Sequence, residues 1–186
     1  MVFTKADPNS AGDVVCLINN AAGAIENCLD FSSSTPVLKG ADLWHASWTS
    51  DGKMVFEAWG GPLNSDDIFM VNADGSGLTQ ITNNAGTKNY DECPWVNSAG
   101  TEMVFDTWND TTQYYEIAKI NLSTKQRFTL TSGTQADAWD PLSTSGGVVY
   151  VTKLDADKSL ELYLFGFGRV RLTNNTYADY FESSTK

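Results

Sequence analysis

One short phrase recurs along the chain and constrains its fold more than any other feature. "MVF" begins at Met1, Met54 and Met103, and "VVY" at Val148 takes its place in the last part of the chain. The units that start at these phrases are residues 1–53, 54–102, 103–147 and 148–186. A repeat of roughly 40 to 50 residues is typical of folds that stack one supersecondary unit on itself. We therefore expect a single domain, residues 1–186, built from four units.

Each unit has the pattern of four short β-strands. An acidic residue leads the apolar run after each opening phrase, at Asp13, Asp67, Glu116 and Glu161. A third apolar stretch follows, and then an Asp-rich aromatic segment runs into the next opening phrase. No segment keeps an apolar period of about 3.6 residues, so helix is not expected. Four-stranded units cannot bury both faces alone, which predicts an all-β fold, a small β-propeller of four four-stranded blades. An eight-strand sandwich is the alternative, but it would not require the same phrase four times.

The two ends of the chain complement each other. The last unit ends in "YADYFESSTK", which has the pattern of the Asp-rich aromatic segment, the innermost strand of a blade, and no opening phrase follows it. The first unit begins with an opening phrase, and no innermost strand precedes it. We expect residues 177–186 to lie beside residues 1–7, so that the N- and C-terminal strands close one blade and leave no free edge. Whether a monomer or a homodimer completes the ring stays open.

Charge and hydropathy exclude several classes of partner. The formal net charge is -11, from 23 acidic and 12 basic residues, which repels nucleic acid and anionic lipid. No apolar run approaches the roughly 18 residues of a membrane span. The first residues lack the pattern of a signal peptide. The residues themselves leave the cellular compartment unknown.

The second unit carries a family resemblance. Its phrase "DIFMVNADGSGLTQITNN", followed by "CPW" and "GTEMVF", resembles the TolB-type, WD-like β-propeller repeat. Residues 72–75 match the turn of that repeat, residues 81–83 its Leu-Thr-Asn step, and Pro94 with Trp95 its Trp step. The resemblance implies a scaffold that binds partners, and a bacterial extracytoplasmic location, periplasmic or secreted. Members of the family usually have six or seven blades, whereas this chain supplies four.

Acidic and aromatic residues of the inner-strand segments form the candidate site. Asp42, Asp91, Asp137 and Asp179 recur there, and in similar propellers this segment lies near one mouth of the central channel. Converging carboxylates would attract Ca²⁺, another cation or a cationic ligand. The alternative is that these aspartates cap repeated turns. The full candidate set for ligand binding is Asp42, Trp44, His45, Trp59, Asp91, Glu92, Trp108, Asp137, Trp139, Asp140 and Asp179.

Two tryptophans occupy equivalent positions. Trp59 and Trp108 each lie five residues after an opening phrase begins. Strand alternation puts Glu57 on the face of Trp59 and Asp106 on the face of Trp108. Such pairs suit stacking of a sugar or a cationic group. Packing between neighbouring blades is the alternative.

Catalytic signatures are weak. His45 is the single histidine, and no nucleophile elbow, zinc-protease motif or phosphate loop is present. We therefore expect a non-enzymatic recognition scaffold that binds a protein, peptide or glycan at the acidic channel mouth. It requires no cofactor, although Ca²⁺ or another cation could bind. The alternative is a carboxylate-based or metal-dependent carbohydrate-active enzyme, a lyase or glycosidase, on the same scaffold.

Three cysteines allow two interpretations. Cys16, Cys28 and Cys93 have no metal-ligand spacing, and small buried apolar side chains are one interpretation. Aligning the first two units places Cys16 and Cys28 symmetrically about a hairpin turn near Ala22, where a disulfide would form in an oxidising compartment. The sequence leaves both open.

Overall fold

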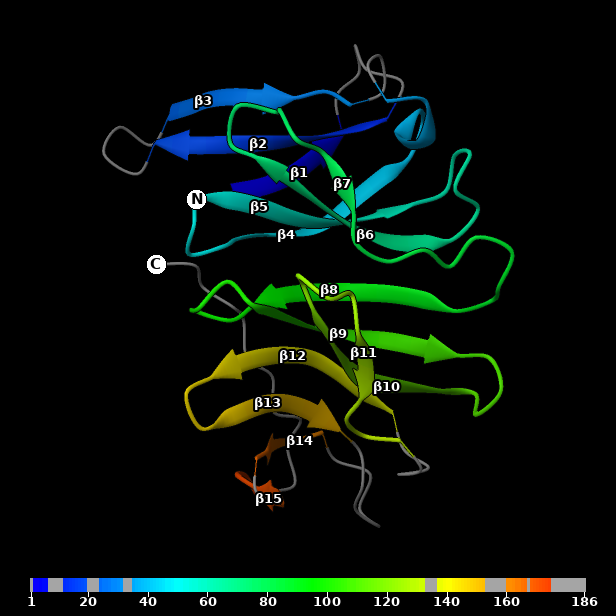
Figure 1. Ribbon diagram of the computed structural model, residues 1–186, viewed down its shortest axis with the longest axis vertical. Coiled ribbons are helices and arrows are strands. Elements are labelled where there is room, and N and C mark those ends of the chain that lie inside the picture. The colour runs from blue at the N-terminus through cyan, green and yellow to red at the C-terminus, as the bar shows by residue number, and fades with distance from the viewer. Residues whose placement is uncertain are drawn as a thin grey trace.

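Antiparallel β-sheets dominate the described part of the chain. The computed structural model describes residues 2–6, 12–19, 24–31, 35–132, 137–152, 160–166 and 168–174. Within this part of the chain the strands form four groups stacked in chain order, from β1–β3 at the top of Figure 1 to β12–β15 at the bottom. We call each group a sheet, although β4–β7 and β8–β11 are joined by hydrogen bonds into one eight-stranded sheet. The single helical element among these residues is a short 3-10 turn at Pro36–Leu38. No described helix is long and apolar enough to cross a membrane.

The sheets follow one plan. The first contains β1 (Val2–Ala6), β2 (Asp13–Asn19) and β3 (Ala24–Leu29). The second contains β4 (Asp42–Trp48), β5 (Lys53–Trp59), β6 (Asp66–Asn72) and β7 (Thr79–Gln80). The third contains β8 (Tyr90–Val96), β9 (Glu102–Asn109), β10 (Tyr114–Asn121) and β11 (Arg127–Thr129). The fourth contains β12 (Ala138–Thr144), β13 (Gly147–Thr152), β14 (Glu161–Phe165) and β15 (Arg169–Arg171). One parallel bridge, from Asp66 to Tyr90, connects the second and third sheets.

The opening phrase recurs because it supplies both faces of a buried strand. In β5, Met54 and Phe56 pack against the first sheet, whereas Val55 lies in the cluster shared with the third sheet. In β9, Phe105 likewise faces the second sheet and Val104 the fourth. Successive side chains of a strand point to opposite faces, so one three-residue phrase fills two interfaces.

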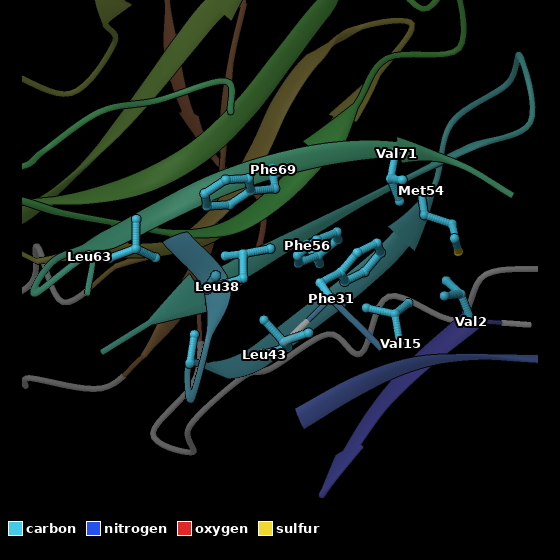
Figure 2. Close-up of a cluster of buried hydrophobic side chains, with 12 residues drawn as sticks. Val2, Val15, Phe31, Leu38, Leu43, Met54, Phe56, Leu63, Phe69 and Val71 are labelled. Carbon is cyan, nitrogen blue, oxygen red and sulfur yellow. The ribbon is translucent and has the colours of Figure 1, made fainter. Parts of the chain in front are cut away.

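Among the described residues, the core therefore consists of three clusters, one between each consecutive pair of sheets. Figure 2 shows the first, where the rings of Phe31, Phe56 and Phe69 stack with centroids 5.5 and 6.0 Å apart. In the described part of the chain, none of the three clusters joins the fourth sheet to the first. The closed ring of four blades is thus not seen there. The predicted pairing of residues 177–186 with 1–7 falls largely on residues outside the described set.

The recurring acidic residues and threonines have a structural role. On β6, β10 and β14, the residues Asp67, Glu116 and Glu161 have the same register, opposite Ala58, Thr107 and Thr152. The hydroxyls of Thr82, Thr131 and Thr173 accept hydrogen bonds of 2.8 to 2.9 Å from the amides of Ile68, Ile117 and Leu162. The Leu-Thr-Asn step thus satisfies a backbone donor beside a buried acid.

The first sheet contains a disulfide. Cys16 on β2 and Cys28 on β3 are directly opposite each other and are bonded, with their Cα atoms 4.0 Å apart. The structure therefore has the bonded arrangement, not two separate buried thiols. Cys93 is free.

Candidate functional site

The inner strands of three sheets carry a β-bulge at the same position. The pairing register shifts after Trp44 in β4, after Glu92 in β8 and after Trp139 in β12. The next residues are His45, Cys93 and Asp140, with backbone φ angles of 47°, 50° and 49°. A left-handed conformation is uncommon for a residue other than glycine. A bulge re-aims its side chain, so each of the three sheets presents one side chain with a donor atom at an equivalent place.

The second strands add buried carboxylates. Glu57 lies opposite Trp44, and Asp106 occupies the equivalent position opposite Glu92. Each accepts a hydrogen bond from the bulge amide of the following sheet. The Cys93 amide donates to Glu57 Oε2 at 3.2 Å, and the Asp140 amide donates to Asp106 Oδ2 at 3.2 Å. These bonds hold consecutive sheets together at their inner ends.

Five side chains form what we call the inner cluster: His45, Glu57, Cys93, Asp106 and Asp140. Donor atoms of the first three lie within 4.8 Å of one another, and so do those of the last three. Cys93 belongs to both groups. His45 Nδ1 also lies 2.8 Å from Glu57 Oε2.

The inner cluster contains more acidic groups than basic ones. Burial, followed by the charge of Glu92, raises the pKa of Asp106 well above its usual range. Burial and the neighbouring acids also raise the pKa of the Cys93 thiol. The hydrogen bond to Glu57 raises the pKa of His45. Asp106 Oδ1 is buried and has no hydrogen-bond partner among the described residues. The cluster would therefore be stabilised by a cation.

Asp91 does not belong to this cluster. Its fully buried carboxylate accepts two hydrogen bonds from Arg127, at 2.9 and 3.0 Å, and Arg127 also donates to Thr107. The register explains why. Asp42 pairs with Trp59, and the residue that pairs with the equivalent Trp108 is Tyr90. Asp91 is therefore one residue further along its strand than Asp42 is along β4, and its side chain points to the other face of the sheet.

The other recurring aspartates are placed separately. Asp137 Oδ1 accepts the amide of Tyr115 at 2.9 Å, a bond between the fourth and third sheets. Asp179 is outside the described residues. The register of Asp91 differs by one residue from that of Asp42, which corrects the alignment of these two aspartates made from the sequence.

Two of the candidate tryptophans share one open face. Trp44 and Trp59 are 52% and 50% exposed. Trp44 lies opposite Glu57 and Trp59 opposite Asp42, and opposite residues of an antiparallel pair point to the same face. Two exposed indoles therefore lie on the same side of β4 and β5 as the carboxylates of Asp42 and Glu57, and the buried Glu57 also belongs to the inner cluster.

The remaining candidates surround Tyr115. Its ring contacts those of Trp108 and Trp139, with centroids 5.3 and 6.5 Å away. Its hydroxyl donates to Glu92 Oε1 at 3.1 Å. Burial, with a contribution from Glu57, raises the pKa of Glu92. Tyr115 was not among the sequence candidates, although it directly precedes Glu116, the acidic residue that marks the third strand of its unit.

Cys93 was also missed as a site residue, although a signal for it exists. Pro94 follows Cys93, and Pro141 follows Asp140, inside runs that otherwise look like strands. Proline within a strand marks an edge or a bulge. The two prolines could therefore have located both bulges from the sequence.

Two hollows between the sheets lie away from this chemistry. One of about 250 Å³ has residues of the second and third sheets in its wall, including Gly77 and Gly100. Another of about 670 Å³ is lined by residues of the third and fourth, including Ser145 and Gly146. Neither is lined by a residue of the inner cluster.

Comparison with known proteins places the fold. No family model and no curated protein match the chain. TolB from Acinetobacter baumannii has a similar structure, with a TM-score of 0.69 and 16% identity over 95% of this chain and 42% of that one. A putative TolB from Agrobacterium tumefaciens has a TM-score of 0.58 and 16% identity, over 92% of this chain and 64% of that one. A puromycin-hydrolyzing peptidase from Mycobacterium tuberculosis has a TM-score of 0.58 and 14% identity, over 94% of this chain and 30% of that one.

The chain thus spans less than two thirds of the length of each of these structures. At such low identities the likeness concerns the fold, because one fold hosts many functions. Together with the stacked four-strand sheets, it identifies the chain as an all-β protein whose fold is related to the TolB-like β-propeller.

Proposed function

We propose that the chain is a non-enzymatic recognition scaffold that binds a cationic segment of a protein or peptide. One observation carries the proposal: the half-exposed indoles of Trp44 and Trp59 share a face of β4 and β5 with the carboxylates of Asp42 and Glu57. An ammonium or guanidinium group placed there would meet two aromatic faces and the carboxylate of Asp42, and the charge of the buried Glu57 would add to the attraction.

The energetics favour a cation over a neutral ligand. A cation over an indole ring gains about 0.5 to 2 kcal/mol, more when water is excluded. The net charge of -11 would also accelerate the approach of a basic ligand. The likeness to TolB structures supports a binding role for the scaffold. The disulfide suits an oxidising compartment, in which we expect the interaction to occur.

Calorimetric titration with short oligo-arginine and oligo-lysine peptides tests the proposal. We expect Trp44→Ala and Trp59→Ala each to weaken binding by roughly tenfold, and added salt to weaken it further. Phe128→Ala is the matched control, because Phe128 is also an exposed aromatic residue but lies on the outer strand β11. The proposal fails if the tryptophan variants bind these peptides as tightly as the unchanged chain, or if the unchanged chain binds none.

A carbohydrate-active enzyme is the second candidate function. The observation that favours it is Glu92, whose raised pKa suits a general acid. Glu92 accepts a hydrogen bond from Tyr115, whose ring contacts those of Trp108 and Trp139. Glu57 would be the second carboxylate. Turnover of an oligosaccharide panel that is abolished by Glu92→Gln, in a variant that melts like the unchanged chain, would replace the binding proposal by this one.

A further inference from the structure

We propose that the inner cluster is a binding site for a divalent transition metal, with Zn²⁺ as the reference ion and Cys93, Asp106 and Asp140 as ligands. The inference is independent of the proposed recognition of basic peptides. It concerns a side-chain cluster that the sequence pattern did not assemble, and it names a different class of ion from the Ca²⁺ considered from the sequence.

The ligand atoms converge from two sheets. A carboxylate oxygen of Asp106 on β9, one of Asp140 on β12 and the sulfur of Cys93 on β8 lie within 4.8 Å of one another. A tetrahedral Zn²⁺ with bonds of about 2.0 to 2.3 Å holds its ligands roughly 3.5 Å apart, so small side-chain rotations would complete the arrangement. The bulges at Cys93 and Asp140 aim both side chains toward Asp106.

Asp106 supplies an independent sign of a missing partner. Its side chain is only 1% exposed, and Oδ2 already accepts the Asp140 amide. Oδ1 is buried with no hydrogen-bond partner among the described residues. A buried carboxylate oxygen left without a partner is costly, and a metal ion at this place would satisfy it.

The charges around the cluster point the same way. Glu57, Glu92 and Asp140 all act on Asp106. His45 is bound to Glu57, and Arg127 is already paired with Asp91 on the other face of β8. The charges of Asp106 and Asp140 also act on His45, but one imidazolium cannot balance these two acids together with Glu57. A divalent ion would add two positive charges to two carboxylates and a thiolate.

The donor types select the class of metal. Ca²⁺ and Mg²⁺ take oxygen ligands, whereas a cysteine sulfur beside carboxylates suits Zn²⁺ and similar ions. On binding, the Cys93 thiol loses its proton to solvent and the sulfur forms the bond to the metal. Glu57 holds the Cys93 amide and His45 Nδ1, which positions the sulfur. Asp140 is exposed, so a fourth position would be open to water or another ligand.

Titration of the full chain with Co²⁺, a coloured substitute for Zn²⁺, tests the site. No reductant is added, so that the Cys16–Cys28 disulfide stays intact and Cys93 is the one free thiol. We expect one equivalent of Co²⁺ to produce a near-ultraviolet thiolate-to-metal absorption band, which Zn²⁺ then removes. Cys93→Ser should abolish the band and weaken Zn²⁺ binding by more than about tenfold. Asp106→Asn should weaken Zn²⁺ binding by a similar factor.

Asp74→Asn serves as the control, because Asp74 is an exposed turn residue whose oxygen accepts from Ser76, and asparagine keeps that acceptor. If Cys93→Ser or Asp106→Asn does not fold, Asp140→Asn, at an exposed position, gives the same comparison. Absence of the band at one equivalent of Co²⁺, or unchanged affinity in a folded Cys93→Ser or Asp140→Asn variant, would overturn the proposal.

Discussion

Asp66 shows how single residues set the pH response of this protein. It is buried at the start of β6, and its Oδ1 has no hydrogen-bond partner among the described residues. Burial, with the charges of Glu57 and Glu92, raises its pKa from 3.8 to about 8. The folded chain therefore holds a proton that the unfolded chain releases between about pH 4 and pH 8. Stability should fall as the pH rises through that window, because ionised Asp66 is disfavoured only in the folded state.

The Asp66→Asn variant should remove this penalty. We expect it to be more stable than the unchanged chain at about pH 8, by on the order of 1 to 3 kcal/mol, and to lose part of the pH slope. Urea unfolding at about pH 5 and about pH 8, with EDTA present, measures both effects. Asp74→Asn, at an exposed turn, should keep the original slope. An Asp66→Asn variant with that same slope would show that Asp66 ionises normally in the folded state.

At the scale of strands, the sequence predicted much of what the structure contains. The opening phrases and the acidic residues that follow them mark the second and third strands of the second, third and fourth sheets, because side-chain alternation repeats with every unit. The bulges were not predicted, and they move His45, Cys93 and Asp140 to the inner cluster. A one-residue difference in register also separates Asp91 from Asp42. A shift of one residue in strand register moves a side chain to the other face of the sheet. Such a shift cannot be read from the position of a residue in the sequence.

The ion pair between Arg127 and Asp91 likewise lay beyond sequence reasoning, because 36 residues separate the partners. The guanidinium on β11 crosses the ring of Phe105 on β9 to reach β8, at the opposite edge of the same sheet. Asp91 is fully buried, so removing its partner leaves an uncompensated charge.

We therefore expect Arg127→Ala to lower the free energy of unfolding by about 3 kcal/mol or more. Arg127→Lys should restore only part of this, since an ammonium group cannot make both parallel hydrogen bonds. Chemical denaturation at neutral pH gives the values. Lys88→Ala is the comparison, because Lys88 is 78% exposed and its contact with Asp110 is 3.9 Å long. Equal effects of the alanine substitutions at 127 and 88 would mean that the pair adds no stability.

At the scale of the whole molecule, each sheet depends on its neighbours. Three hydrophobic clusters and the carboxylate-to-amide bonds of Glu57 and Asp106 join consecutive sheets in the described part of the chain. In such a stack, stability is a sum of nearest-neighbour contacts. The repeat therefore predicts how two sheets pack but not how many complete a ring, which is why the predicted four-bladed closure does not follow from the phrase alone.

The closure has a direct test in the last ten residues. Residues 177–186 repeat the inner-strand pattern, and the opening phrase at Met1 would be their partner in the first sheet. If they form that strand, deleting them exposes apolar side chains of a sheet edge and should cost about 3 kcal/mol or more, well beyond the effect of trimming a tail. Thermal melts of the full and shortened chains measure the loss, and light scattering checks that both have the same mass in solution. Phe181→Asp, which keeps the length, should reproduce most of the effect because it places a charge on the apolar side of the predicted strand. If instead the shortened chain melts at the same temperature as the full chain, the two ends do not share a sheet and the stack of sheets stays open within one chain.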